Sequence, residues 1–110
     1  MGAIHVNSQG YADTLDLLIV AFCRDYSTRA CAIAEKQYKR RTLMEYEYIN
    51  RRLRDAAIEI VGADFEHYIN EIGNKIGYAY SKINGISETE YKERKREVKL
   101  NIAKKLHLLD

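Results

Sequence analysis

Proline and tryptophan are both absent from the 110-residue sequence, and glycine occurs only six times. Proline removes a backbone donor and breaks helix interiors, so a chain without it can form long uninterrupted helices. Strand-like alternation of apolar and polar residues is also scarce, whereas apolar residues recur at helical spacing. The sequence therefore predicts an all-α protein.

Long apolar stretches are missing as well. The longest run, Leu17–Cys23, has seven residues, whereas a membrane-spanning helix needs about 20. The first residues lack the cationic and apolar regions of a signal peptide, and Val6 stands where a myristoylation signal has Ser or Thr. We expect a cytoplasmic protein without a membrane partner.

Cysteine is too rare to form a disulfide scaffold. Cys23 and Cys31 are the only two, and within one helix they would lie about 12 Å apart along the axis, too far to bridge. They also lack the spacing of a zinc site. We interpret them as small buried hydrophobic residues in a reducing compartment.

What the sequence does contain is the composition of a folded globule. Apolar residues make up 46% and charged residues 31%, which separates the chain from disordered proteins. A chain of this length accommodates one domain with one core. We therefore expect a single helical domain over residues 1–110, with a less ordered N-terminal segment at 1–10.

Apolar periodicity and terminal signals predict about four amphipathic helices. The first contains the apolar run Leu17–Cys23 and is expected in the middle of the core. Short connections favour antiparallel neighbours in a four-helix bundle, with a looser orthogonal packing as the alternative. The expected ranges are approximately 12–39, 43–61, 64–83 and 88–107.

Several residues carry the helix boundaries. Thr42 and Ser87 each precede a glutamate by three residues, which is the pattern of a capping box. Gly62 and the pair Asn84-Gly85 are expected to end helices. Asp64 is expected to cap the third helix.

Charge alternates along the chain in four blocks. Residues 1–35 carry 2 basic and 4 acidic side chains, 36–54 carry 7 and 2, 55–90 carry 2 and 7, and 91–110 carry 7 and 3. The blocks therefore have net charges of −2, +5, −5 and +4, which sum to the overall +2. Clustered lysine and arginine attract phosphates, so the two basic blocks are candidate binding surfaces.

Both basic blocks are expected on helices. The first is interleaved with Tyr38, Tyr46 and Tyr48, a mixture of cations and aromatic rings that suits phosphates and stacked bases. The second places its cations on one flank of the last helix. We therefore predict a non-enzymatic regulatory or accessory protein that binds nucleic acid, or another partner, through Lys39, Arg40, Arg41, Arg51, Arg54, Lys92, Arg96 and Lys99.

Two other interpretations of these charges remain. Arg51 can pair with Glu47 or Asp55 one turn away, so the first alternative is an ordinary solvated helix face. Acidic and basic blocks of different molecules can also meet, so the second alternative is a self-association or protein–protein interaction module, including a homo-oligomer.

No pattern of catalytic residues stands out. The sequence has no Gly-x-Ser-x-Gly motif, neither cysteine has a histidine near it in sequence, and His67 with Glu71 resembles an exposed helix pair. We expect no enzyme activity, no cofactor, no metal and no small-molecule ligand.

Two glycines stand inside the third expected helix. Gly73 and Gly77 are four residues apart and match neither a Walker motif nor a dinucleotide fingerprint. Each costs about 1 kcal/mol in a helix relative to alanine. We interpret the pair as the site of a close helix crossing.

Overall fold

The computed structural model describes residues 9–109, and every regular element within that range is a helix. The predicted all-α fold is confirmed. Of the predicted N-terminal segment 1–10, residues 1–8 lie outside the described range and residues 9 and 10 belong to the first helix. The elements are α1 (Gln9–Arg24), α2 (Tyr26–Glu35), α3 (Arg40–Val61), η1 (Gly62–Asp64), α4 (Phe65–Gly73), η2 (Tyr78–Tyr80) and α5 (Glu88–Lys105).

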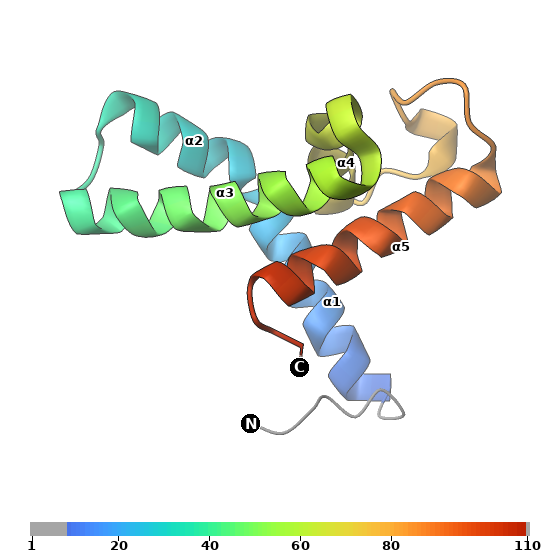
Figure 1. The fold of residues 1–110 in the computed structure, drawn as a ribbon, viewed down its shortest axis with the longest axis horizontal. Helices are drawn as coiled ribbons and strands as arrows, with labels where there is room; N and C mark the ends of the chain where they lie inside the picture. Colours follow the sequence, from blue (N-terminus) through green and yellow to red (C-terminus); the bar gives the residue numbers. More distant parts are fainter. Residues whose placement is uncertain (1–8, 110) are drawn as a thin grey trace.

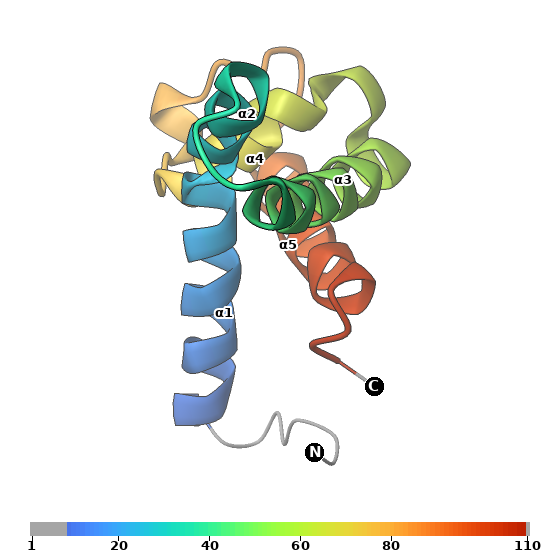
Figure 2. The same ribbon diagram turned by 90° about the vertical axis from the view of Figure 1, so that its left-hand side faces the viewer.

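The first predicted helix, 12–39, is divided into α1 and α2 by a turn at Asp25. The chain changes direction there, and α2 then lies beside α3 (Figures 1 and 2). The buried side chain of Arg29 stabilises this turn, because it donates to the carbonyl of Phe22 near the end of α1 and to Asn50 Oδ1 on α3 at 2.7 Å.

The third predicted helix, 64–83, extends only to Gly73. Lys75 has a positive φ of 55°, and the chain then forms an irregular segment with the short turn η2 before α5. The buried carboxylate of Glu71 accepts hydrogen bonds from Ser81 Oγ at 2.6 Å and from the backbone N–H of Lys82 at 2.9 Å. These bonds fold the following chain back onto α4 instead of continuing the helix.

The boundary signals were correct in part. Ser87 caps α5, where its Oγ accepts from the N–H of Glu90 at 3.1 Å, and Gly62 ends α3 with a φ of +60°. The predicted capping box at Thr42 is wrong, because α3 begins two residues earlier with Lys39 at its N-cap.

The helices form two layers in which α1 and α4 lie behind α3 and α5 (Figures 1 and 2). α1 crosses α3 steeply, so the packing is closer to the orthogonal alternative than to aligned neighbours. The molecule measures 42 × 38 × 21 Å with a radius of gyration of 14.5 Å, above the roughly 13 Å expected for a compact domain of this length. The fold is therefore flattened and extended.

The core lies where α1, α3, α4 and α5 meet. Small side chains allow close approach there, since Ala56, Ala57 and Ala103 are fully buried. A smaller cluster of Tyr68, Ile83 and Tyr91 joins α4 to α5. The main core consists of Ile19, Val20, Cys23, Leu53, Ala56, Ala57, Ile69, Ile72, Val98, Ile102 and Ala103.

α1 is not the enclosed central helix that the apolar run predicted. It buries Ile19 and Cys23 on one side, whereas Leu17 and Leu18 remain exposed. Among the helices within residues 9–109, none is both long enough and apolar enough to cross a membrane.

The glycine prediction is confirmed at Gly73. A Cβ atom added there would lie 2.6 Å from Arg24 Cα and 2.7 Å from the carbonyl carbon of Cys23, so α4 meets the backbone of α1 where only glycine fits. Gly77 lies beyond the helix, where a Cβ atom added to it would meet no other atom within 4 Å, and it takes no part in the crossing.

Candidate nucleic-acid interface

The solvent-facing side of the first half of α3 carries an apolar stripe flanked by arginines. Met44 and Tyr48, one turn apart, are 61% and 45% exposed. At 100° per residue, arginines stand on both sides of this pair. We name the α3 outer face as the set Arg40, Arg41, Met44, Tyr48, Arg51 and Arg52.

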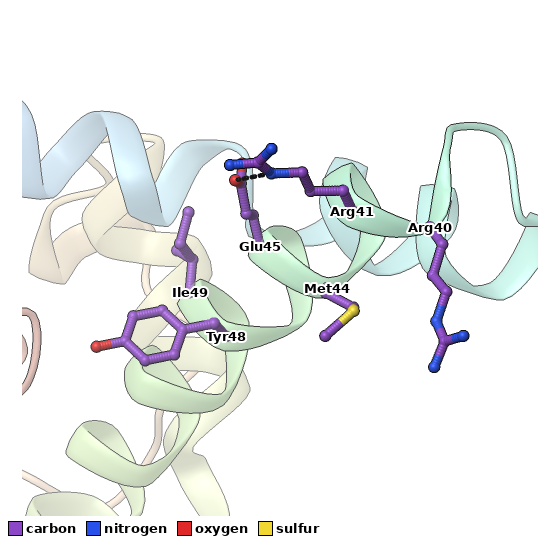
Figure 3. A pocket seen from close by; sticks show the side chains of 6 residues that line it. All are labelled: Arg40, Arg41, Met44, Glu45, Tyr48 and Ile49. Carbon is purple, nitrogen blue, oxygen red and sulfur yellow. Dashed lines mark ion pairs between the residues drawn. The ribbon is translucent and has the colours of Figure 1, made fainter.

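A shallow, open recess on this face is lined mainly by apolar atoms (Figure 3). Arg40, Met44 and Tyr48 extend to one side of the helix, whereas Arg41 extends along another side and pairs with Glu45 at 3.8 Å. Because all its lining residues come from α3, the recess is a surface depression rather than an enclosed site. It can accept a flat group or a chain lying along the helix.

Tyr48 is an aromatic platform already covered by a cation. The guanidinium carbon of Arg52 lies 4.7 Å from the centre of the Tyr48 ring, within the range of a cation–π interaction. Sequence reasoning did not select Arg52 or Met44. Their positions four residues after and before Tyr48 were the available signal, because residues at that spacing share a helix face.

The tip of the α2–α3 hairpin adds cations to this face. Lys39 and Arg40 are exposed at the start of α3, and neither forms an ion pair within the part of the chain that the structure describes. Tyr38, also at the tip, is 54% exposed and packs edge-on against Tyr46 with ring centres 5.9 Å apart. Free cations and an exposed ring thus occur together at one protruding end.

The remaining predicted residues of α3, Arg51 and Arg54, are less accessible to a ligand, through an ion pair in one case and partial burial in the other. Arg51 pairs with Glu47 at 3.1 Å, as the solvated-face interpretation expected. Arg54 is half-buried and forms no ion pair within residues 9–109. Exposed pairs such as Arg51–Glu47 are each worth at most about 1 kcal/mol, so a phosphate can replace the carboxylate.

In α5 the predicted cations are all paired. Lys92 lies 2.9 Å from Glu88 and Arg96 lies 3.7 Å from Glu93, both within the helix. Lys99 donates to Asp16 of α1 at 2.8 Å. This basic block therefore faces internal partners, and its acidic neighbours dilute its charge.

The two predicted basic blocks do not form one surface. α3 begins at one end of the longest axis and α5 begins at the other (Figure 1), and the molecule extends 42 Å along that axis. A ligand that contacts the hairpin tip would have to be long to reach the start of α5 as well.

A separate polar cleft gathers His67 and Cys23, two residues that the sequence left apart. The cleft lies between the α1–α2 turn and α4, has a volume of about 270 Å³, and is lined by Cys23, Arg24, Tyr26, Ser27, Glu66, His67, Ile69, Asn70 and Lys82. Burial raises the pKa of the Cys23 thiol to about 12, although Arg29 and Lys99 lower it in part. The thiol is therefore protonated at neutral pH and is not the thiolate that nucleophilic catalysis uses.

The other cysteine departs from its prediction. Cys31 is exposed on α2, and its Sγ donates to the Glu35 carboxylate at 2.9 Å. Cys23 is buried as predicted. The chain turns at Asp25 between them, so the two cysteines belong to different helices.

Glu71 shows that a buried carboxylate here is structural. Burial alone would raise its pKa, but hydrogen bonds from Ser81, the Lys82 N–H and Tyr91 outweigh it and hold the pKa below the usual 4.5. The Lys95 ammonium lies 5.0 Å from the Tyr91 ring centre and donates to the carbonyl of Ile76 at 2.7 Å. Because Ser81, the Lys82 N–H and Tyr91 already donate to the Glu71 carboxylate, Glu71 is not available to a ligand.

Across residues 9–109, no cluster of three or more His, Cys, Asp or Glu side chains is placed to hold a metal ion. Comparisons with protein-family models, with characterised proteins and with solved structures found no match to this chain.

Proposed function

We propose that the protein binds nucleic acid through the α3 outer face and the hairpin tip, in a regulatory or accessory role without a catalytic step. The observation that carries the proposal is the exposed Met44–Tyr48 stripe with arginines on both sides. Arginine binds phosphates in a bidentate manner, and an exposed tyrosine ring can stack a base.

The unpaired state of the tip supports the same assignment. Lys39 and Arg40 have no acidic partner within residues 9–109, so a phosphate need not displace a carboxylate from them. Arg41 and Arg51 would exchange weak, exposed pairs for phosphate contacts. Of the eight residues predicted from sequence, we retain Lys39, Arg40, Arg41 and Arg51 as the binding set, because Arg54 is half-buried and lies outside the α3 outer face.

The cations of α5 contribute less to the proposal. Lys92 and Arg96 form exposed pairs as weak as those of Arg41 and Arg51, but four glutamates on the same helix, Glu88, Glu90, Glu93 and Glu97, offset their charge. Lys99 joins α5 to Asp16 of α1. We therefore assign the α5 cations at most a long-range attraction to a polyanion.

Fluorescence anisotropy tests the proposal directly. Labelled duplex and single-stranded oligonucleotides of the same sequence would be titrated with the protein at about 50 and 200 mM salt. We expect binding at the lower salt that weakens steeply at the higher, because each neutralised phosphate releases counterions. Absence of binding to both oligonucleotides at the lower salt would refute the proposal.

A further inference from the structure

The outward side of α1 is an apolar surface that no other helix within residues 9–109 covers. Leu17 is 58% exposed and Leu18 is 41% exposed, and Ala21 falls between them on the helix surface at 100° per residue. Ile19 and Cys23, on the opposite side, are buried in the core. Figure 2 shows α1 at the edge of the molecule, with α3 and α5 on one side only.

An apolar helix face of this kind is normally covered. The run Leu17–Cys23 carries no charge at all, yet the core buries only one side of it, and the part of the chain that the structure describes leaves Leu17 and Leu18 on the other side exposed. We propose that the outward face of α1 packs against the same face of a second copy of this chain, with the two helices antiparallel.

The charges at the two ends of α1 favour this occupant. Asp13 lies near the start of the helix and Arg24 is its last residue, and helical geometry places both on the side of Leu17. Both side chains are exposed. A two-fold axis perpendicular to an antiparallel pair brings Asp13 of one copy beside Arg24 of the other, and does so twice.

A parallel pair would instead place like charges together. The existing contact of Arg24 with Asp25, at 3.4 Å, is exposed on both sides and leaves the guanidinium accessible to a second carboxylate. The face thus complements itself in charge as well as in hydrophobicity. The proposed dimer contact uses α1, in the layer opposite α3. The dimer proposal is therefore independent of nucleic-acid binding through the α3 outer face.

Sedimentation equilibrium over roughly 5 to 500 µM protein tests the pairing, because a contact limited to a helix about 24 Å long should be weak. We expect a monomer mass at the lower end and a dimer mass at the upper end. L17E and L18E should remain monomeric throughout, with helical content by circular dichroism equal to that of the unmodified protein. The matched control L100E alters an exposed leucine of α5, 42% exposed, and should still dimerise.

Charge exchange tests the antiparallel arrangement. D13K and R24E should each weaken the dimer several-fold, and the double variant should restore it. A monomer at every concentration would overturn the proposal and leave residues 1–8 or an unrelated protein as the cover of this face. A dimer that persists in L17E, or a double variant weaker than both single variants, would overturn it equally.

Discussion

The hydroxyl group of Tyr91 on α5 donates a hydrogen bond to the buried carboxylate of Glu71 on α4 at 2.7 Å. Since the same carboxylate also binds Ser81 and Lys82, one side chain connects two helices with the irregular segment between them. This connection explains why the segment after Gly73, despite its helical periodicity, does not continue the α-helix and contains only the short η2 before α5.

Replacing Glu71 with alanine should destabilise the protein by about 3 kcal/mol, because it leaves buried donors without an acceptor. Chemical denaturation monitored by circular dichroism measures the change. The matched control is E66A, an exposed carboxylate on the same helix, which should change the free energy of unfolding by less than about 0.5 kcal/mol. Equal effects of the two substitutions would contradict the role given to Glu71.

Acid should remove the contribution of Glu71. Its pKa in the folded protein is below the usual 4.5, so its stabilisation is complete above the pKa of the unfolded chain and is lost as pH falls through the folded pKa. The difference in stability between the unmodified protein and E71Q should therefore be largest near neutral pH and shrink between about pH 5 and pH 2. A difference that does not vary with pH would show that the charge of Glu71 is unimportant.

Alanine at Gly73 should destabilise the fold by about 2 kcal/mol or more, since the added Cβ would overlap the backbone of Arg24. The control is G77A, where the space is open and φ is −86°. There alanine should be neutral or stabilise by up to about 1 kcal/mol, because it reduces the freedom of the unfolded chain. The two melting temperatures should move in opposite directions or differ by several degrees, and a similar decrease in both would contradict the crossing.

Tyr48 should matter more for single strands than for duplexes, because only unpaired bases can stack on its ring. We expect Y48A to weaken single-strand binding by about tenfold and duplex binding by much less. Y80A is the control, since Tyr80 is 85% exposed but lies in the segment before α5, away from the α3 outer face. Anisotropy titrations with both variants decide the matter, and equal losses would contradict a stacking role for Tyr48.

Sequence reasoning captured the features that depend on local chemistry. Helical periodicity predicted the all-α fold, Ser87 and Gly62 marked real helix ends, and Gly73 indicated a close crossing. It missed features that depend on contacts between distant residues. The break at Asp25 relies on Arg29 reaching Asn50, 21 positions away, and the end of α4 relies on Glu71 binding residues ten or more positions later.

For the candidate site, the sequence identified the cations but not which of them form ion pairs. The cations of α3 and α5 looked equivalent in sequence, because spacing alone does not show which of them find carboxylates. Pairing of Lys99 with Asp16, 83 positions apart, could only be seen in the fold. The exposed Met44–Tyr48 stripe was not predicted either, because apolar residues at helical spacing usually indicate a buried face.

The most direct measurement compares the two basic blocks in one nucleic-acid binding assay. The double variant R40E/R41E alters the α3 outer face, and K92E/R96E alters the same number of charges on α5. At about 50 mM salt we expect the α3 variant to lose at least tenfold in affinity and its salt slope to fall by about 2, with the α5 variant within about threefold of the unmodified protein. Equal losses in both variants, or a greater loss in the α5 variant, would contradict binding through the α3 outer face.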